Sequence, residues 1–204
     1  MQQAIALIEV NSIAAGMESL DAMVKAARVK VLLAKPVCPG KYIIVVGGEV
    51  SCVESARDAG LAVAGETLID RLYLPRPHVQ VFERMSGLVR RPLPAAFGVI
   101  ETFTVASALR AADASVKAAP VALVQIKLAV GIGGKYYLSM VGEVGDVEAS
   151  VDAGVETIEP RTLLLRRVIL ANPHPDAEPY LIWGGDVPRE SDRNGGLHAE
   201  VSGT

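Results

Sequence analysis

Apolar residues follow two different periods along the chain, and the two periods alternate in a fixed order. Residues 4–10 form a short apolar run that suits a buried strand, and residues 13–27 carry apolar side chains at spacings of 4, 3, 4 and 3. Such spacing is typical of an amphipathic helix, which Ser12 can cap. Strand-like segments at 29–34 and 42–48, a helical stretch at about 50–64 and a strand at 67–74 follow. The pattern predicts the order βαββαβ.

The same order occurs twice, because the chain contains an internal repeat. The segment that begins at Ala4 matches the segment that begins at Ala96 after a shift of 92 positions. Identical residues include Glu9 and Glu101, Asp21 and Asp113, and Lys25 and Lys117. From the Gly-Lys before the third strand onward the shift is 94, since the second copy has two extra residues there. A period this long exceeds the ~20 to 50 residues of solenoid repeats, so each copy is a domain.

The fold class that follows is α/β (α+β), with two tandem ferredoxin-like units. Each βαββαβ unit normally forms an antiparallel four-stranded sheet with helices on one face. We place the first domain at 1–87 and a linker at 88–95, where Pro92 and Pro94 interrupt any helix or central strand. The second domain covers 96–184. Residues 185–204 are polar and rich in glycine, which predicts a disordered tail.

Composition and charge narrow the possible functions. The chain of 204 residues is 50% hydrophobic and 21% charged, which excludes disorder over most of its length. It has 20 basic and 23 acidic residues and no Lys/Arg run, which argues against nucleic acid as a partner. No apolar run reaches the ~18 residues of a membrane span. We therefore expect a cytoplasmic protein without a membrane partner.

Several motifs resemble the shell-protein domain of bacterial microcompartments. They are DAMVKAA and AADASVKAA on the first helices, the Gly-Lys before the third strand, GEVxxVExxxDAG, and LPRPH near the end of the first copy. Two such domains in tandem are similar to the trimeric, non-permuted members of that family. KPVCPGKYIIVVGGEV further resembles the tandem shell proteins of propanediol-utilisation microcompartments, a type implicated in holding an iron-sulfur cluster at its pore.

The resemblance implies a homotrimer, a pseudohexamer in which six domains surround a central axis. A ring of head-to-tail contacts closes when its rotation is right. In this family the loop between the second and third strands lines the pore. The expected pore residues are Pro39, Gly40 and Lys41 from the first copy and Gly131, Ile132, Gly133, Gly134 and Lys135 from the second.

Cys38 is the candidate metal ligand, because a trimer would bring one such thiol from each chain to the axis. Four cysteine thiolates are the usual ligands of a [4Fe-4S] cluster, so three would leave one iron open. The resemblance favours one cluster per trimer, with Lys41 supplying positive charge near the thiol. The alternative is that Cys38 only lines the pore. Cys52, 14 positions further on, forms no compact ligand motif with Cys38, and the three histidines lack metal-ligand spacing.

Three basic residues are candidates for contacts between rings. From sequence alone, Lys25 and Lys117 fit a solvated helix face. In the family this lysine lies at the rim beside its symmetry mate, and the arginine of PRPH, here Arg76, contributes to the same edge. The second copy has Asn172 in place of that arginine.

The leading hypothesis is a structural tile that contacts neighbouring shell proteins and, through a redox centre, an encapsulated redox enzyme. A second hypothesis is a metal-free pore for a small metabolite. A third is a pair of RNA-recognition modules, but these need stacking aromatics, and the third strand of the first copy offers only Tyr42. No catalytic arrangement has credible spacing. Glu9 and Glu101 suit backbone hydrogen bonds at a strand end, so we predict a non-enzyme.

Overall fold

Each copy of the repeat forms one antiparallel sheet of four strands in the computed structural model, which describes residues 3–85, 95–128 and 133–183. The first sheet has the order β2-β3-β1-β4 and consists of β1 (Gln3–Val10), β2 (Lys30–Val37), β3 (Lys41–Glu49) and β4 (Leu68–Pro75). The second has the order β6-β7-β5-β8 and consists of β5 (Ala96–Thr102), β6 (Ala122–Leu128), β7 (Tyr136–Gly142) and β8 (Leu164–Ala171). The fold class predicted from the sequence is confirmed.

Two helices pack on one face of each sheet. They are α1 (Ile13–Ala26) and α2 (Val50–Ala64) on the first, and α4 (Val105–Ala118) and α5 (Val144–Glu156) on the second. Short 3₁₀ turns occupy Gly65–Thr67, Arg161–Leu163 and Pro175–Ala177. The hydroxyl of Ser12 accepts a hydrogen bond from the amide of Ala15 at 3.3 Å, and Thr104 caps α4 in the same way at 3.2 Å from the amide of Ser107. The expected cap of the first helix is therefore present.

Two short helices were not predicted. They are α3 (Val79–Met85) and α6 (Glu178–Trp183), which follow the last strand of each copy. With 7 and 6 residues they make fewer than two turns, too few for an apolar stripe to be recognised. The predicted tail at 185–204 and most of the linker at 88–95 lie outside the described residues.

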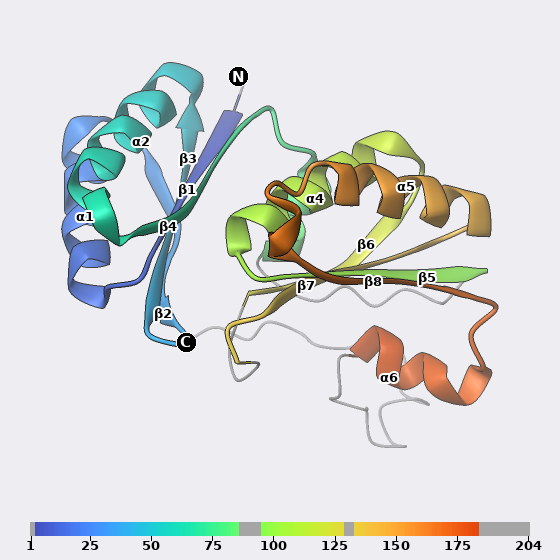
Figure 1. The fold of residues 1–204 in the computed structure, drawn as a ribbon. Coiled ribbons are helices and arrows are strands. Elements are labelled where there is room, and N and C mark those ends of the chain that lie inside the picture. Colours follow the sequence, from blue (N-terminus) through green and yellow to red (C-terminus); the bar gives the residue numbers. More distant parts are fainter. Residues whose placement is uncertain (1–2, 86–94, 129–132, 184–204) are drawn as a thin grey trace, which may run out of the picture.

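The first sheet is covered on both faces. Successive residues of β1 point to opposite sides, so Ala6 and Ile8 join the cluster under α1 and α2. Leu7 belongs instead to a cluster that contains Leu72 of β4 and Leu109 of α4. Helix α4 contacts both β1 and β4, and so the first helix of the second domain covers the free face of the first sheet (Figure 1).

Helix α3 also crosses from the first domain to the second, where it caps the edge strand β6. The side-chain amide of Gln80 accepts from the amide of Leu123 at 2.8 Å and donates to the carbonyl of Val121 at 3.2 Å. The guanidinium of Arg84 donates to the carbonyl of Leu123 at 2.8 Å. These side chains satisfy backbone groups that an edge strand leaves unpaired.

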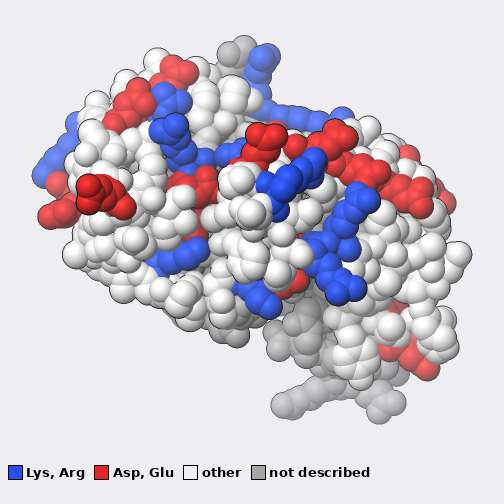
Figure 2. Space-filling model, in the orientation of Figure 1, with Lys and Arg blue, Asp and Glu red and all other residues white. Residues whose placement is uncertain are grey.

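Basic and acidic side chains are interspersed on the face drawn in Figure 2, without an extended area of one sign. No helix in the described ranges has the length and apolar character needed to cross a membrane.

Candidate functional site

Cys38, Pro39 and Gly40 form the short turn between β2 and β3. The thiol of Cys38 is free and exposed, and Gly40 has a φ of 75°, in the left-handed region that favours glycine. The corresponding loop between β6 and β7 contains Gly133 and Gly134. The expected pore residues Gly131 and Ile132 lie outside the described residues.

The two loops contact each other although they are far apart in sequence. A β-carbon added at Gly134 would lie 2.6 Å from Cδ of Pro39 and 3.1 Å from the carbonyl oxygen of Cys38. Only a residue without a side chain allows this approach. The fold therefore brings Cys38, Pro39 and Gly134 together at one end of the domain junction.

We expect Gly134→Ala to destabilise the protein by about 2 kcal/mol or more, because the methyl group would collide with Pro39 in addition to the cost of a left-handed alanine. Gly133→Ala is the matched control. Its φ of 62° is similar to the 76° of Gly134, but its β-carbon would meet nothing within 4 Å. Denaturant titration of both variants measures the difference, and equal losses would show that the loops do not touch.

Glu9 is the centre of a buried network at the junction of the two domains. Its carboxylate accepts from Nζ of Lys41 at 2.9 Å, from the amide of Val105 at 2.9 Å and from the hydroxyl of Tyr136 at 3.1 Å. Lys41 also donates to the carbonyl of Phe103 at 3.2 Å and lies 5.5 Å from the centre of the Tyr136 ring. Val105, Phe103 and Tyr136 belong to the second domain, so this network joins the domains.

Burial shifts the pKa values of two groups in this network. Removal from water raises the pKa of Glu9, while the charge of Lys41 and the hydrogen bonds from Lys41, Val105 and Tyr136 act in the opposite direction. Burial, followed by the charge and hydrogen bond of Glu9, raises the pKa of Tyr136, so its hydroxyl stays a donor.

The structure qualifies the role expected for Lys41. Its ammonium group forms an ion pair with Glu9 inside the junction, where the side chains of Lys41 and Glu9 are 16% and 0% exposed. The positive charge that the sequence suggested for the Cys38 thiol is directed at this carboxylate. The expectation that Glu9 accepts from backbone is met, but the amide belongs to the other domain.

The equivalent pair of the second domain is open to solvent. Nζ of Lys135 lies 3.9 Å from Glu101, with side chains 48% and 31% exposed. The same residues are thus sealed in one copy and uncovered in the other.

The candidate edge residues differ in their surroundings. Nζ of Lys117 pairs with Asp113 at 2.5 Å and donates to the carbonyl of Arg76 at 3.2 Å. Lys25 pairs with Asp21 at 2.5 Å, and its side chain is 73% exposed. Arg76 and Asn172 both adopt positive φ, 57° and 46°, so the turn is conserved between the copies although the side chain is not.

The described part of the chain contains no group of three or more His, Cys, Asp or Glu residues that could hold a metal ion. Cys52 lies on α2 and is partly buried. His78 and His174 instead accept backbone hydrogen bonds through Nδ1, from Gln80 at 3.3 Å and Asp176 at 3.2 Å. A cluster held by Cys38 would need more than one chain.

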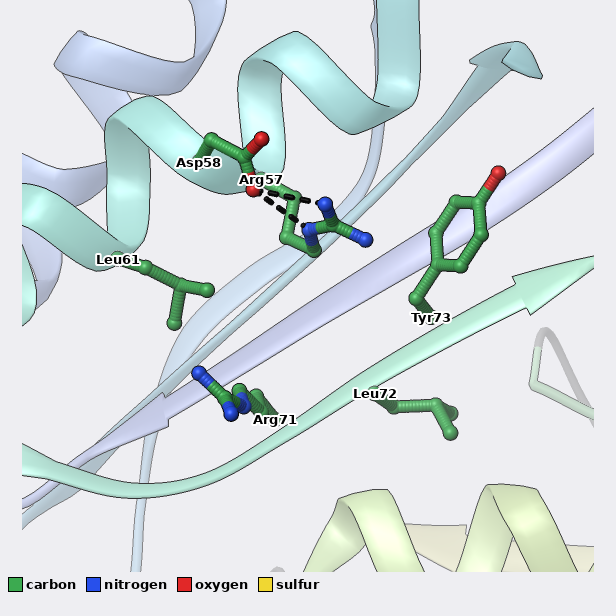
Figure 3. Close-up of a pocket in the computed structure, with 6 residues that line it drawn as sticks. All are labelled: Arg57, Asp58, Leu61, Arg71, Leu72 and Tyr73. Atoms are coloured by element: carbon green, nitrogen blue, oxygen red, sulfur yellow. Dashed lines mark hydrogen bonds and ion pairs between the residues drawn. The ribbon is translucent and has the colours of Figure 1, made fainter. Parts of the chain in front are cut away.

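A surface pocket of about 360 Å³ lies between α2 and β4 (Figure 3). Arg57 forms an ion pair with Asp58 at 2.8 Å and lies 4.9 Å from the centre of the Tyr73 ring. The pocket is lined by Arg57, Asp58, Leu61, Arg71, Leu72 and Tyr73. In this pocket the Arg57 side chain is thus already engaged by Asp58 and by the Tyr73 ring.

The structure does not support the RNA-recognition hypothesis, because its candidate stacking residue is buried. The Tyr42 side chain is only 6% exposed and packs in the core under α1 and α2. A base could not stack on it.

The chain has tandem repeats, two βαββαβ sheets and paired loops at the domain junction, and comparison with known proteins identifies its family. The model of the BMC domain family matches residues 4–77 and 96–173. The chain therefore belongs to the BMC-domain family of bacterial microcompartment shell proteins, whose members are structural proteins that tile with other shell proteins.

Individual relatives span both domains or one. The bacterial microcompartment shell protein PduT of Citrobacter freundii is 42% identical over 174 residues, 85% of this chain and 95% of PduT. The carboxysome shell protein CsoS1C of Hydrogenovibrio crunogenus is 41% identical over 98 residues, 47% of this chain and 93% of CsoS1C. A crystal structure of a microcompartment protein from Desulfitobacterium hafniense is 44% identical, with a TM-score of 0.77 over 86% of this chain and 98% of that protein.

Proposed function

We propose that this shell protein forms a homotrimeric tile in which six domains surround a central pore. The observation that carries the proposal is the direction of the domain junction. The sheet of the first domain contacts the helix α4 of the second, so each domain uses a different surface. Such head-to-tail contacts generate a closed ring when they repeat with the right rotation.

The paired loops at the junction are the proposed pore lining. They contain Pro39, Gly40, Gly133 and Gly134, with Cys38 exposed beside them. Three-fold symmetry then supplies three Cys38 thiols at the axis. The basic pore residues Lys41 and Lys135 stand behind the loops and hold the carboxylates of Glu9 and Glu101.

We further propose that Cys38 from three chains holds one [4Fe-4S] cluster. Thiolate is the ligand type that these clusters use, and an exposed free thiol can reach a shared site. Three thiolates leave one iron for water, a small ligand or a partner. The cluster would supply one-electron redox chemistry at the pore, for electron transfer across the shell or cluster passage, with an encapsulated redox enzyme as partner.

Light scattering and an iron assay on an anaerobic preparation test this function. We expect a trimer at micromolar concentration with about four irons per three chains. A stable monomer would refute the tile. A trimer without iron would refute the cluster alone.

A metal-free tile that conducts a small metabolite is the second candidate. It is favoured by the open space at Gly40 and Gly133, where an added β-carbon would meet nothing within 4 Å. The iron content of the trimer distinguishes the two.

For the tile edge, we expect Lys25→Asp to leave a soluble trimer that no longer forms extended sheets. The side chain is 73% exposed, so folding should change by less than ~0.5 kcal/mol. Electron microscopy of concentrated protein provides the measurement, and Lys30→Asp on β2 is the control substitution. Unchanged sheets would remove Lys25 from the edge.

A further inference from the structure

The pocket between α2 and β4 contains two guanidinium groups, and only one of them has an acidic partner. Arg57 pairs with Asp58, the next residue of α2, through Nε and Nη2, each 2.8 Å from the same carboxylate oxygen. Arg71 lines the same pocket from β4 (Figure 3). Its backbone amide and carbonyl have side-chain partners, but among the described residues its guanidinium has no hydrogen bond or ion pair.

The second domain shows what the arginine of this strand does when an acid is within reach. The sheet registers equate Arg71 with Arg167, and the repeat equates Asp58 with Asp152. Asp152 on α5 forms an ion pair with Arg167 on β8, which bridges helix and strand. In the first domain Asp58 binds Arg57 instead, and the described residues contain no such bridge to Arg71.

One substitution between the copies accounts for this difference. The counterpart of Arg57 is Val151, which is fully buried and belongs to the apolar core. A valine offers no charge, so the acid that follows it pairs with the strand. Figure 3 shows the Asp58 carboxylate directed at Arg57, with the Arg71 side chain apart from both. The first domain therefore has an unpaired base where the second has an ion pair.

The charges and the lining of the pocket indicate the class of ligand. Two guanidinium groups and one carboxylate leave one positive charge. Asp70, the next acid along the strand, is directed at the second domain, where its carboxylate accepts from the hydroxyl of Thr104 at 2.6 Å. Leu61, Leu72 and the ring of Tyr73 supply apolar walls. The volume of about 360 Å³ is that of a site for a small molecule.

We propose that this pocket binds a small organic acid as its monoanion, with the carboxylate on the guanidinium of Arg71 and the apolar part against Leu61 and Leu72. A guanidinium group binds a carboxylate through two parallel hydrogen bonds. One excess positive charge matches a monoanion, whereas a phosphate group at neutral pH carries more negative charge than the pocket neutralises. None of the lining residues belongs to the paired loops, so this site is separate from the proposed pore and does not rest on the proposed trimer.

Binding of benzoate tests the site. We expect the whole protein to bind benzoate with a Kd on the order of 1 mM and to bind neutral benzamide about tenfold more weakly, because benzamide lacks the charge. Arg71→Met should weaken benzoate binding by about tenfold or more. Arg167→Met is the matched control, since it makes the same change at the equivalent position of the second domain, and it should leave binding unchanged. Titration by saturation-transfer difference NMR measures the affinities.

A rescue variant tests the exchange of partners. Arg57→Val reproduces the residue of the second domain and should allow Asp58 to pair with Arg71, which would lower the affinity for benzoate by about tenfold. The double variant Arg57→Val/Asp58→Asn removes the competing carboxylate while Arg71 stays in place. Its affinity should therefore recover toward that of the wild type.

Four results would overturn the proposal. They are a wild-type protein that binds no benzoate well above the expected Kd, equal affinities for benzoate and benzamide, equal effects of Arg71→Met and Arg167→Met, and a double variant that does not recover. Tighter binding of phenyl phosphate than of benzoate would overturn the choice of a monoanion.

Discussion

Replacement of Cys38 by serine is expected to remove essentially all iron from the trimer and to leave its assembly intact. The thiol is exposed on a turn between two strands, and Cys38 belongs to none of the three hydrophobic core clusters of the described residues. Since each chain contributes one ligand, a single substitution removes three thiolates at once. Exposed substitutions of this kind change stability by less than ~0.5 kcal/mol. An iron assay, the absorption spectrum and light scattering on one anaerobic preparation measure these effects.

Cys52→Ser is the control, since it removes the other cysteine of the chain, which lies partly buried on α2. It should keep both the iron and the colour. The expected ratio of about four irons per three chains falls to about half for a two-iron cluster. Iron that survives Cys38→Ser, or about four irons in every single chain, would place the metal elsewhere.

Replacement of Lys41 by methionine should cost about 3 kcal/mol of stability, because it leaves the buried carboxylate of Glu9 without its countercharge. The carboxylate is fully shielded from solvent and would retain only the donors Val105 and Tyr136. Denaturant titration at one fixed protein concentration gives the change. Lys25→Met is the control, since it breaks an exposed pair four residues apart on a helix, worth ~0.5 kcal/mol or less.

The loss in Lys41→Met should also depend on pH. Burial already raises the pKa of Glu9 above its ordinary value of 4.5, and without Lys41 the pKa rises further. The folded state then holds a proton that the unfolded state has released, so stability is greatest below pH 4.5 and falls as the pH rises through the raised value. The variant should therefore lose less stability near pH 5 than near pH 8. An equal loss at both pH values, or a loss equal to that of Lys25→Met, would contradict the network.

The predictions that succeeded rest on local patterns. The stripe at 13–27 and the cap at Ser12 predicted α1, and its repetition 92 positions later predicted α4. Apolar residues recur at a fixed period in helices and strands of ordinary length, and this period can be recognised in a single sequence. Helices α3 and α6 are shorter than that period requires, and they went unrecognised.

Only part of the candidate site could be predicted from such local patterns. Cys38 and the glycines of the second loop were recognised as a set, and the fold places Cys38 beside Gly134. Lys41 was assigned to the thiol because it is close in sequence, but its partner Glu9 lies 32 residues away on another strand. The repetition of Glu9 as Glu101 and of Lys41 as Lys135 was the one available signal of this pair.

The sequence by itself determined the two domains, their element order and the family motifs, because each is encoded by spacing along the chain. Only the tertiary structure decided how the domains meet. The burial of α4, the exposure of α1 and the network around Glu9 depend on contacts between residues about a hundred positions apart. Two helices with the same stripe have the same local preference, and which of them is buried depends on the surface that packs against it.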